Sequence, residues 1–156
     1  MSPLNHLEQR ALDPVARALL RRLLVPKVYF RAPWPDASST ADLVAVDRAG
    51  TGDVHVVEIK GSARSALSAR TVNRLIQVPA HYLWLAFPRP RQPYNYADAA
   101  LYLADGPGRI GIVEIVPMPG DTLGANIVLP AERFHEHLED ETLRFVRQTK
   151  PDISFR

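Results

Sequence analysis

The chain has 156 residues, 46% apolar and 23% charged, which suits one compact domain rather than a disordered segment. It has no cysteine, which excludes disulfides and thiolate chemistry, and neither a run of the ~20 apolar residues of a membrane helix nor a signal-peptide pattern, so we expect a cytoplasmic protein without membrane contact. Its net charge of +2 is too small to identify a nucleic-acid-binding protein.

The first predicted helix begins at Pro14, because Asp13 is a good N-cap and Pro suits the first helical position. An apolar stripe that continues to Leu24 places this helix over about residues 14–24. Asn5 and Glu8 stand three residues apart, as in a capping box, so an earlier turn can begin at Asn5. The sequence leaves open whether this is one helix kinked at Pro14 or two short pieces.

Three strands are predicted next, over residues 27–31, 42–47 and 54–60, where β-branched and aromatic residues gather. Gly50 and Gly52 separate the last two strands and predict a hairpin. Residues 62–77 are expected to be mostly helical, most clearly over 69–77. Residues 82–87 form a nearly continuous apolar run, typical of a strand covered on both faces.

The second half of the chain is less informative. A proline-rich loop at 88–94 is followed by a predicted strand pair, 101–104 and 110–116, around a turn at 105–108. A final helix or helix pair is expected over about 130–148, with a frayed tail from residue 150. The whole pattern predicts an α/β fold with an αβββαβ core, in which helices flank a mixed central sheet and a C-terminal strand pair and helix extend it.

The predicted hairpin brings charged side chains together. Alternation places Glu58 and Lys60 on the same face as Val54 and Val56. Matching the apolar sets of the two strands then brings Asp42 opposite Glu58 or Lys60. Val44 and Val46 of the preceding strand continue this face. Exposing these four valines would cost about 1.5 kcal/mol or more of lost burial each, so we expect the face to be covered.

A cluster of Asp42 and Glu58 would be stabilised by a cation. Neighbouring carboxylates repel each other, and burial strengthens the repulsion. Lys60 can neutralise part of the charge, but Mg²⁺ does so better, with Asp42, Glu58 and the carbonyl of Ile59 as a partial shell. The metal would activate a water and stabilise a departing oxygen, while Lys60 would orient the water or steady the transition state.

Asp42, fifteen intervening residues and then Glu58-Ile59-Lys60 resemble the active-site motif of the PD-(D/E)XK nuclease superfamily. The resemblance covers about residues 5–87, where the element order is that of the superfamily core; position 41 is Ala instead of the usual Pro. It implies a single restriction-endonuclease-like domain over residues 1–156 and a nuclease that hydrolyses DNA with Mg²⁺ or Mn²⁺. Asp42 and Glu58 would be metal ligands and Lys60 a catalytic residue.

Two further residues match the superfamily pattern. Glu8 would complete the metal site from the first helix, provided that this helix reaches it. Gln77 matches the polar catalytic residue that many members carry on the helix after the lysine. The segments AFPRPRQPY, ALYLADGPG and IGIVEIV are similar, more loosely, to the MmcB-like branch associated with DNA repair.

The charge distribution suggests where DNA would lie. Residues 1–91 hold 13 Lys/Arg against 7 Asp/Glu, whereas residues 92–156 hold 6 against 10. The candidate phosphate contacts follow the strand of Glu58 and the next strand along the chain: Arg64, Arg70, Arg74, Arg89 and Arg91. DNA is the expected partner, and a homodimer is left open.

Two alternatives to a nuclease remain. The chain could be a non-catalytic nucleic-acid-binding or repair-accessory protein on the same fold, or a structural protein in which Lys60 only pairs with Glu58 and Asp42. His55 and His81 are expected to be hydrogen-bonded structural residues rather than bases.

Overall fold

The computed structural model describes residues 5–21, 27–34, 40–47, 52–92, 108–136, 138 and 152–154. Within them the chain forms, in order, α1 (His6–Leu20), β1 (Lys27–Pro33), β2 (Thr40–Val46), β3 (Val54–Ile59), α2 (Ala63–Ala66), α3 (Ala69–Leu75), β4 (Tyr82–Pro88), β5 (Gly111–Met118), β6 (Thr122–Leu129) and β7 (Ile153–Ser154). The predicted order of a helix, three strands, a helical segment and a fourth strand is confirmed.

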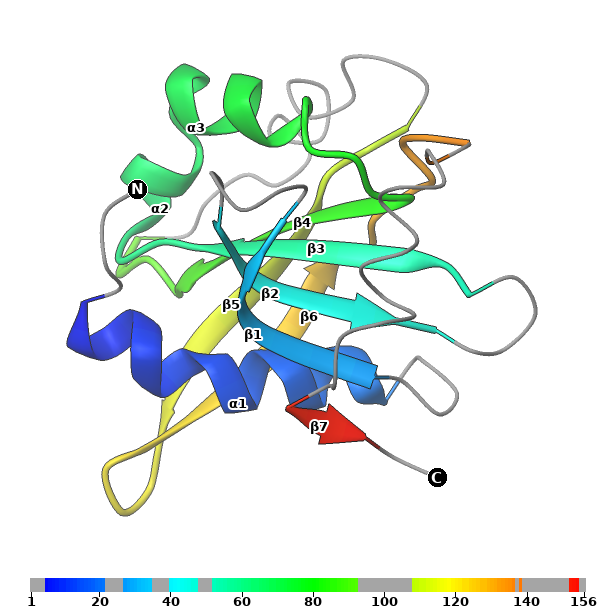
Figure 1. Cartoon of the computed structure of the whole chain (residues 1–156). Coiled ribbons are helices and arrows are strands. Elements are labelled where there is room, and N and C mark those ends of the chain that lie inside the picture. Colours follow the sequence, from blue (N-terminus) through cyan, green and yellow to red (C-terminus); the bar gives the residue numbers. More distant parts are fainter. Residues whose placement is uncertain are drawn as a thin grey trace.

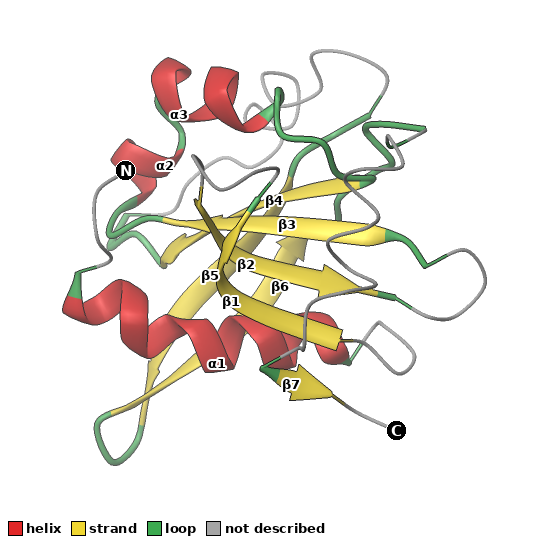
Figure 2. Cartoon of the chain, in the orientation of Figure 1, coloured by secondary structure: helices red, strands yellow, loops and turns green. Residues whose placement is uncertain are grey.

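All of these strands belong to one mixed sheet, in the order β6-β5-β4-β3-β2-β1-β7 (Figure 1). β3, β4 and β5 are parallel neighbours, whereas β1, β2 and β3 pair antiparallel. The carboxyl ends of β3, β4 and β5 therefore meet at one edge, together with the start of β2. Helix α1 covers one face of the sheet, and α2 and α3 cover the other (Figure 2). The predicted α/β fold with a mixed, helix-flanked sheet is confirmed.

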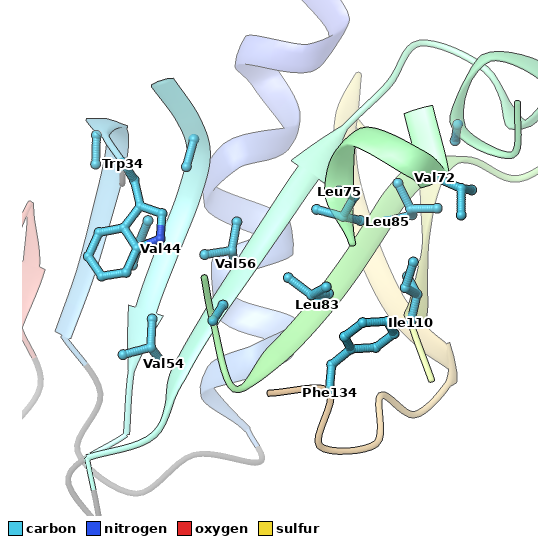
Figure 3. Close-up of a cluster of buried hydrophobic side chains, with 14 of the residues drawn as sticks. Trp34, Val44, Val54, Val56, Val72, Leu75, Leu83, Leu85, Ile110 and Phe134 are labelled. Atoms are coloured by element: carbon cyan, nitrogen blue, oxygen red, sulfur yellow. The ribbon is translucent and has the colours of Figure 1, made fainter. Parts of the chain in front are cut away.

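The valine face of the hairpin lies inside the core, as the alternation predicts. Val44, Val54 and Val56 pack in the same apolar layer as Leu83 of β4 and Leu75 of α3 (Figure 3). The opposite face of the same strands packs against α1 in a second layer. Because both faces of β2 and β3 are covered, polar side chains that extend the valine rows are held at the rim of the core rather than in open solvent.

Helix α1 is one helix that runs through Pro14. It begins eight residues before the predicted start at 14, because the side chain of Asn5 caps it and accepts a hydrogen bond from the Glu8 N–H at 2.8 Å. Asp13 is therefore not an N-cap; its carboxylate pairs with Arg17 at 2.7 Å, one turn later. Residues 23 and 24, which would extend the helix, lie outside the described residues.

The segment after β3, expected to be mostly helical, forms two short helices, α2 and α3, with a break at 67–68. Ser62 caps α2 and Ser68 caps α3, each hydroxyl accepting a backbone N–H three residues ahead, from Ser65 at 3.1 Å and Thr71 at 3.2 Å. Serine competes with the helix backbone for hydrogen bonds, which explains the interruption at 67–68.

Several expectations for the second half are wrong. Both edges of β5 are occupied, by β4 and by β6, so the predicted pairing of 110–116 with 101–104 does not occur; residues 101–104 themselves lie outside the described part. Residues 130–136 are not helical: Glu132 bridges to Arg109, and Phe134 is buried and donates its N–H to the His81 carbonyl. Residues 139–148 lie outside the description. In the tail, β7 pairs with β1 instead of fraying.

Candidate active site

The register of the β2–β3 hairpin sets the geometry of the candidate site. The ladder ends at the pair Leu43–Val57, and one further step places Asp42 opposite Glu58, one of the two predicted alternatives. There a carboxylate oxygen, Oδ2 of Asp42, accepts the Ile59 N–H at 2.8 Å. The carboxylate thus replaces the next backbone acceptor of the ladder, which fixes Asp42 against the end of β3.

Asp42 is a buried carboxylate without an ion-pair partner among the described residues. Only 7% of the residue is exposed. Burial raises its pKa from 3.8 to about 6; the charges of Glu58 and Glu8 raise this pKa as well, while the Ile59 N–H and Lys60 lower it. The ionised form is therefore held at an energetic cost, which a bound cation would relieve.

Glu58, unlike Asp42, is neutralised by two cations. Lys60 places its Nζ 3.3 Å from Oε1 of Glu58, and the Arg74 guanidinium donates to the same oxygen. The backbone N–H of Lys60 is bonded to the Ala86 carbonyl at 2.9 Å, which ties this end of β3 to β4. The sequence analysis missed the contact of Arg74 with Glu58, since it depends on how α3 lies over the sheet.

The first turn of α1 lies at the same end of the sheet. A Cβ on Gly61, just after β3, would stand 3.1 Å from the Asn5 side chain, and the charge of Glu8 contributes to the raised pKa of Asp42. In the part of the chain that the structure describes, however, no three Asp, Glu or His side chains are close enough together to hold a metal ion. Glu8 therefore acts on Asp42 through its charge, and the described geometry does not place it as a third ligand.

A strained arginine adjoins Asp42 on its other side. Arg31 of β1 lies between the pairs Phe30–Leu43 and Ala32–Ala41, level with Asp42 in the ladder. Its backbone is left-handed, with φ 52°, and its Nε is buried without a hydrogen-bond partner among the described residues. Such strain costs on the order of 1–3 kcal/mol and clusters at functional sites. No sequence pattern singled out Arg31.

Gln77 is not brought to this site. It lies in the exposed turn after α3 rather than on the helix, and no contact joins it to Asp42, Glu58 or Lys60. The helix expected over 69–77 ends at Leu75, and the Gln77 N–H bonds to the Arg74 carbonyl at 3.3 Å in the turn that follows.

The predicted phosphate contacts fall into two groups. Arg64, Arg70 and Arg91 are exposed, whereas Arg74 and Arg89 have carboxylate partners. Arg89 approaches Glu114 of β5, with 3.2 Å between Nε and Oε1. Glu114 is buried, and the sequence analysis missed it although it interrupts the apolar run of IGIVEIV. An acidic residue inside an apolar run of strand length is the sequence signal that could have identified Glu114, because acids are seldom buried without a partner.

The two predicted structural histidines lie toward the opposite end of the sheet. His55 accepts a hydrogen bond from the Trp84 indole at 3.1 Å and stacks on Tyr82, and burial lowers its pKa to about 4. Nδ1 of His81 accepts the Val54 N–H at 2.9 Å. Both rings are hydrogen-bonded parts of the sheet, as expected.

The chain matches no protein-family model and no curated protein in sequence. In structure it is similar to SPO1766, a protein of unknown function from Silicibacter pomeroyi, with a TM-score of 0.55 and 16% identity over 94% of this chain and 85% of that chain. This likeness supports the mixed α/β fold alone. None of the helices in the described ranges is long and apolar enough to span a membrane.

Proposed function

We propose that this chain is a divalent-metal-dependent nuclease of the PD-(D/E)XK type, with a restriction-endonuclease-like fold, that hydrolyses DNA phosphodiester bonds in repair or processing of DNA. The observation that carries the proposal is Asp42: a buried carboxylate with no ion-pair partner among the residues that the structure describes, opposite Glu58 and level with the end of β3. A protein that needed Asp42 only for folding would be more stable with a neutral residue there.

The donor set fits Mg²⁺ or Mn²⁺. Asp42 and Glu58 would hold the ion, with the Ile59 carbonyl as a third oxygen, and water and substrate phosphate would complete a shell of the kind that Mg²⁺ prefers. When bound, such an ion supplies Lewis acidity at the scissile phosphate. Glu8 supplies further negative charge from α1, which favours a cation over an anion at this position.

Lys60 is placed to act on the substrate. Its side chain is about a quarter exposed, and its ammonium lies 3.3 Å from the Glu58 carboxylate. From this position it can donate a hydrogen bond to an attacking water or to a phosphate oxygen, which stabilises negative charge in the transition state.

A second candidate is a non-catalytic, DNA-binding accessory protein on the same fold. The ion pairs of Glu58 with both Lys60 and Arg74 favour it, because they satisfy this carboxylate without a metal. The absence of a three-carboxylate group in the described part of the chain favours it as well.

Cleavage of DNA by purified variants separates the two candidates. Asp42→Ala and Glu58→Ala should each abolish cleavage that depends on Mg²⁺ or Mn²⁺, because each removes a ligand. Lys60→Ala should slow cleavage by roughly a hundredfold or more and leave Mn²⁺ binding intact. Asp13→Ala is the matched control, since it removes an exposed carboxylate of α1 and should cut like the wild type.

The substrates are duplex, branched, mismatched and single-stranded DNA, each with and without metal. A wild-type protein that cuts none of them contradicts the nuclease proposal and favours the accessory protein. Equal cutting by all four variants would show a contaminating nuclease. Thermal unfolding with and without Mn²⁺ gives an independent readout, because an ion that binds only the folded state raises its stability.

A further inference from the structure

Arg74 contacts the carboxylate that the proposed metal ion would need. Its guanidinium donates to Oε1 of Glu58, the same oxygen that Lys60 approaches. A guanidinium and a divalent cation at the same carboxylate repel each other, because both are positively charged. The ion pair and the metal therefore compete for Glu58.

Of the two cations, Arg74 is the one that can leave. Lys60 lies two residues from Glu58 at the end of the same strand, and its backbone is bonded to β4. Arg74 projects from α3 and is half exposed, while Val72 and Leu75 anchor this helix in the core. The Arg74 side chain can thus swing away from Glu58 without any change in the backbone of α3.

The position of Arg74 also suits it for a second contact. Arg70 is exposed one helical turn earlier on α3, so the two guanidinium groups share one side of this helix beside the candidate site. A guanidinium released from Glu58 would be a donor for a phosphate group at that side, with the fork geometry that favours bidentate contact.

We propose that Arg74 is a positioning residue that occupies Glu58 in the metal-free protein and is released to bind substrate phosphate when a divalent cation takes its place. This inference rests on the proposed metal site. Metal and DNA then strengthen each other's binding, because each favours the state in which the Arg74–Glu58 pair is broken.

Mn²⁺ titration without DNA, followed by calorimetry, tests the first half of the inference. Arg74→Gln should bind Mn²⁺ about two- to fivefold more tightly than the wild type, the factor expected for loss of a partly exposed competing ion pair. Arg70→Gln is the matched control, because it removes the same charge one turn away without touching Glu58, and its Mn²⁺ affinity should equal that of the wild type.

Each of the other outcomes contradicts a different step of the inference. Equal Mn²⁺ binding by wild type and Arg74→Gln shows that the ion pair does not compete, with the metal site intact. Equal tightening by Arg70→Gln and Arg74→Gln shows that general charge governs the affinity. Absence of Mn²⁺ binding by all three proteins contradicts the proposed metal site itself.

DNA binding tests the second half. In a Lys60→Ala background, which limits cleavage, Mn²⁺ should strengthen binding of a labelled duplex severalfold more when residue 74 is Arg than when it is Gln. An equal gain with either residue would show that Arg74 does not take up the phosphate after its release.

Discussion

Asp42 is a buried carboxylate whose ionisation costs the fold stability. Its pKa is about 6 in the folded protein and 3.8 in the unfolded chain, so the folded state binds more protons between these values. The free energy of unfolding therefore falls as pH rises from about 4 to about 6. Above pH 6, ionised Asp42 costs the fold roughly 3 kcal/mol, from the size of this shift.

We therefore expect Asp42→Asn to stabilise the metal-free protein while abolishing metal-dependent cleavage. The amide oxygen can still accept the Ile59 N–H, but no charge is buried. The gain in unfolding free energy should be roughly 1–3 kcal/mol at pH 7.5 and roughly two thirds smaller at pH 4.5, where Asp42 is protonated in the folded state but still largely ionised in the unfolded chain. Urea denaturation in EDTA at both pH values measures it.

Asp13→Asn is the control for this prediction, since Asp13 is exposed and paired on the surface of α1. It should change the unfolding free energy by less than about 1 kcal/mol at either pH. A lower stability of Asp42→Asn than of the wild type at pH 7.5 would show that the ionised carboxylate stabilises the fold, which would remove the main support for a cation site.

At the scale of the elements, α1 keeps a proline in its interior. Pro14 lacks the N–H that would bond to the Arg10 carbonyl, and its ring crowds the preceding turn. The helix persists because Ala11, Val15 and Leu19 are buried against the sheet. Tertiary burial, rather than local preference, thus carries the helix across Pro14.

Pro14→Ala should consequently stabilise the protein by about 1–2 kcal/mol, since the restored hydrogen bond outweighs the extra freedom of the unfolded chain. Thermal or urea unfolding measures the change. Pro130→Ala is the matched control at an exposed, non-helical position and should leave stability unchanged or slightly lower. A loss of stability in Pro14→Ala would mean that the fixed proline backbone helps α1 more than the missing hydrogen bond harms it.

The hairpin and the central strands could be predicted from sequence because their patterns are local. Alternation along β2 and β3 predicted the buried valine face and placed Asp42 opposite Glu58 or Lys60, and the observed register selects Glu58. The cap at Asn5 could also be predicted, whereas the passage of α1 through Pro14 could not, since it depends on burial against distant strands.

Other elements had no clear local pattern. β6 was missed because most of its residues are partly exposed, so that Thr122–Leu129 carries no clean alternation. The segment 130–136 has helix-forming residues, but contacts with Arg109 and His81 hold it in a non-helical form. The Arg74–Glu58 pair likewise required the placement of α3 over β3, which no spacing along the chain encodes.

For the molecule as a whole, the two faces of the sheet offer different surfaces to a polyanion. Arg64 and Arg70 are exposed on α2 and α3, on the face that the helix carrying Arg74 covers. Arg17 and Arg21 are exposed on and just after α1, on the opposite face. If DNA approaches the end of β3 over α2 and α3, only the first pair lies along its phosphates.

The double variant Arg64→Gln/Arg70→Gln should weaken DNA binding and reduce the slope of log affinity against log salt by about 1–2, because each lost phosphate contact removes roughly one released counterion. Arg17→Gln/Arg21→Gln makes the same change in net charge and should leave that slope unaltered. Fluorescence anisotropy of a labelled duplex over a range of salt concentrations measures both. Equal changes in the two double variants would show that overall charge, not a defined track beside Glu58, governs binding, and would contradict the placement of DNA over α2 and α3.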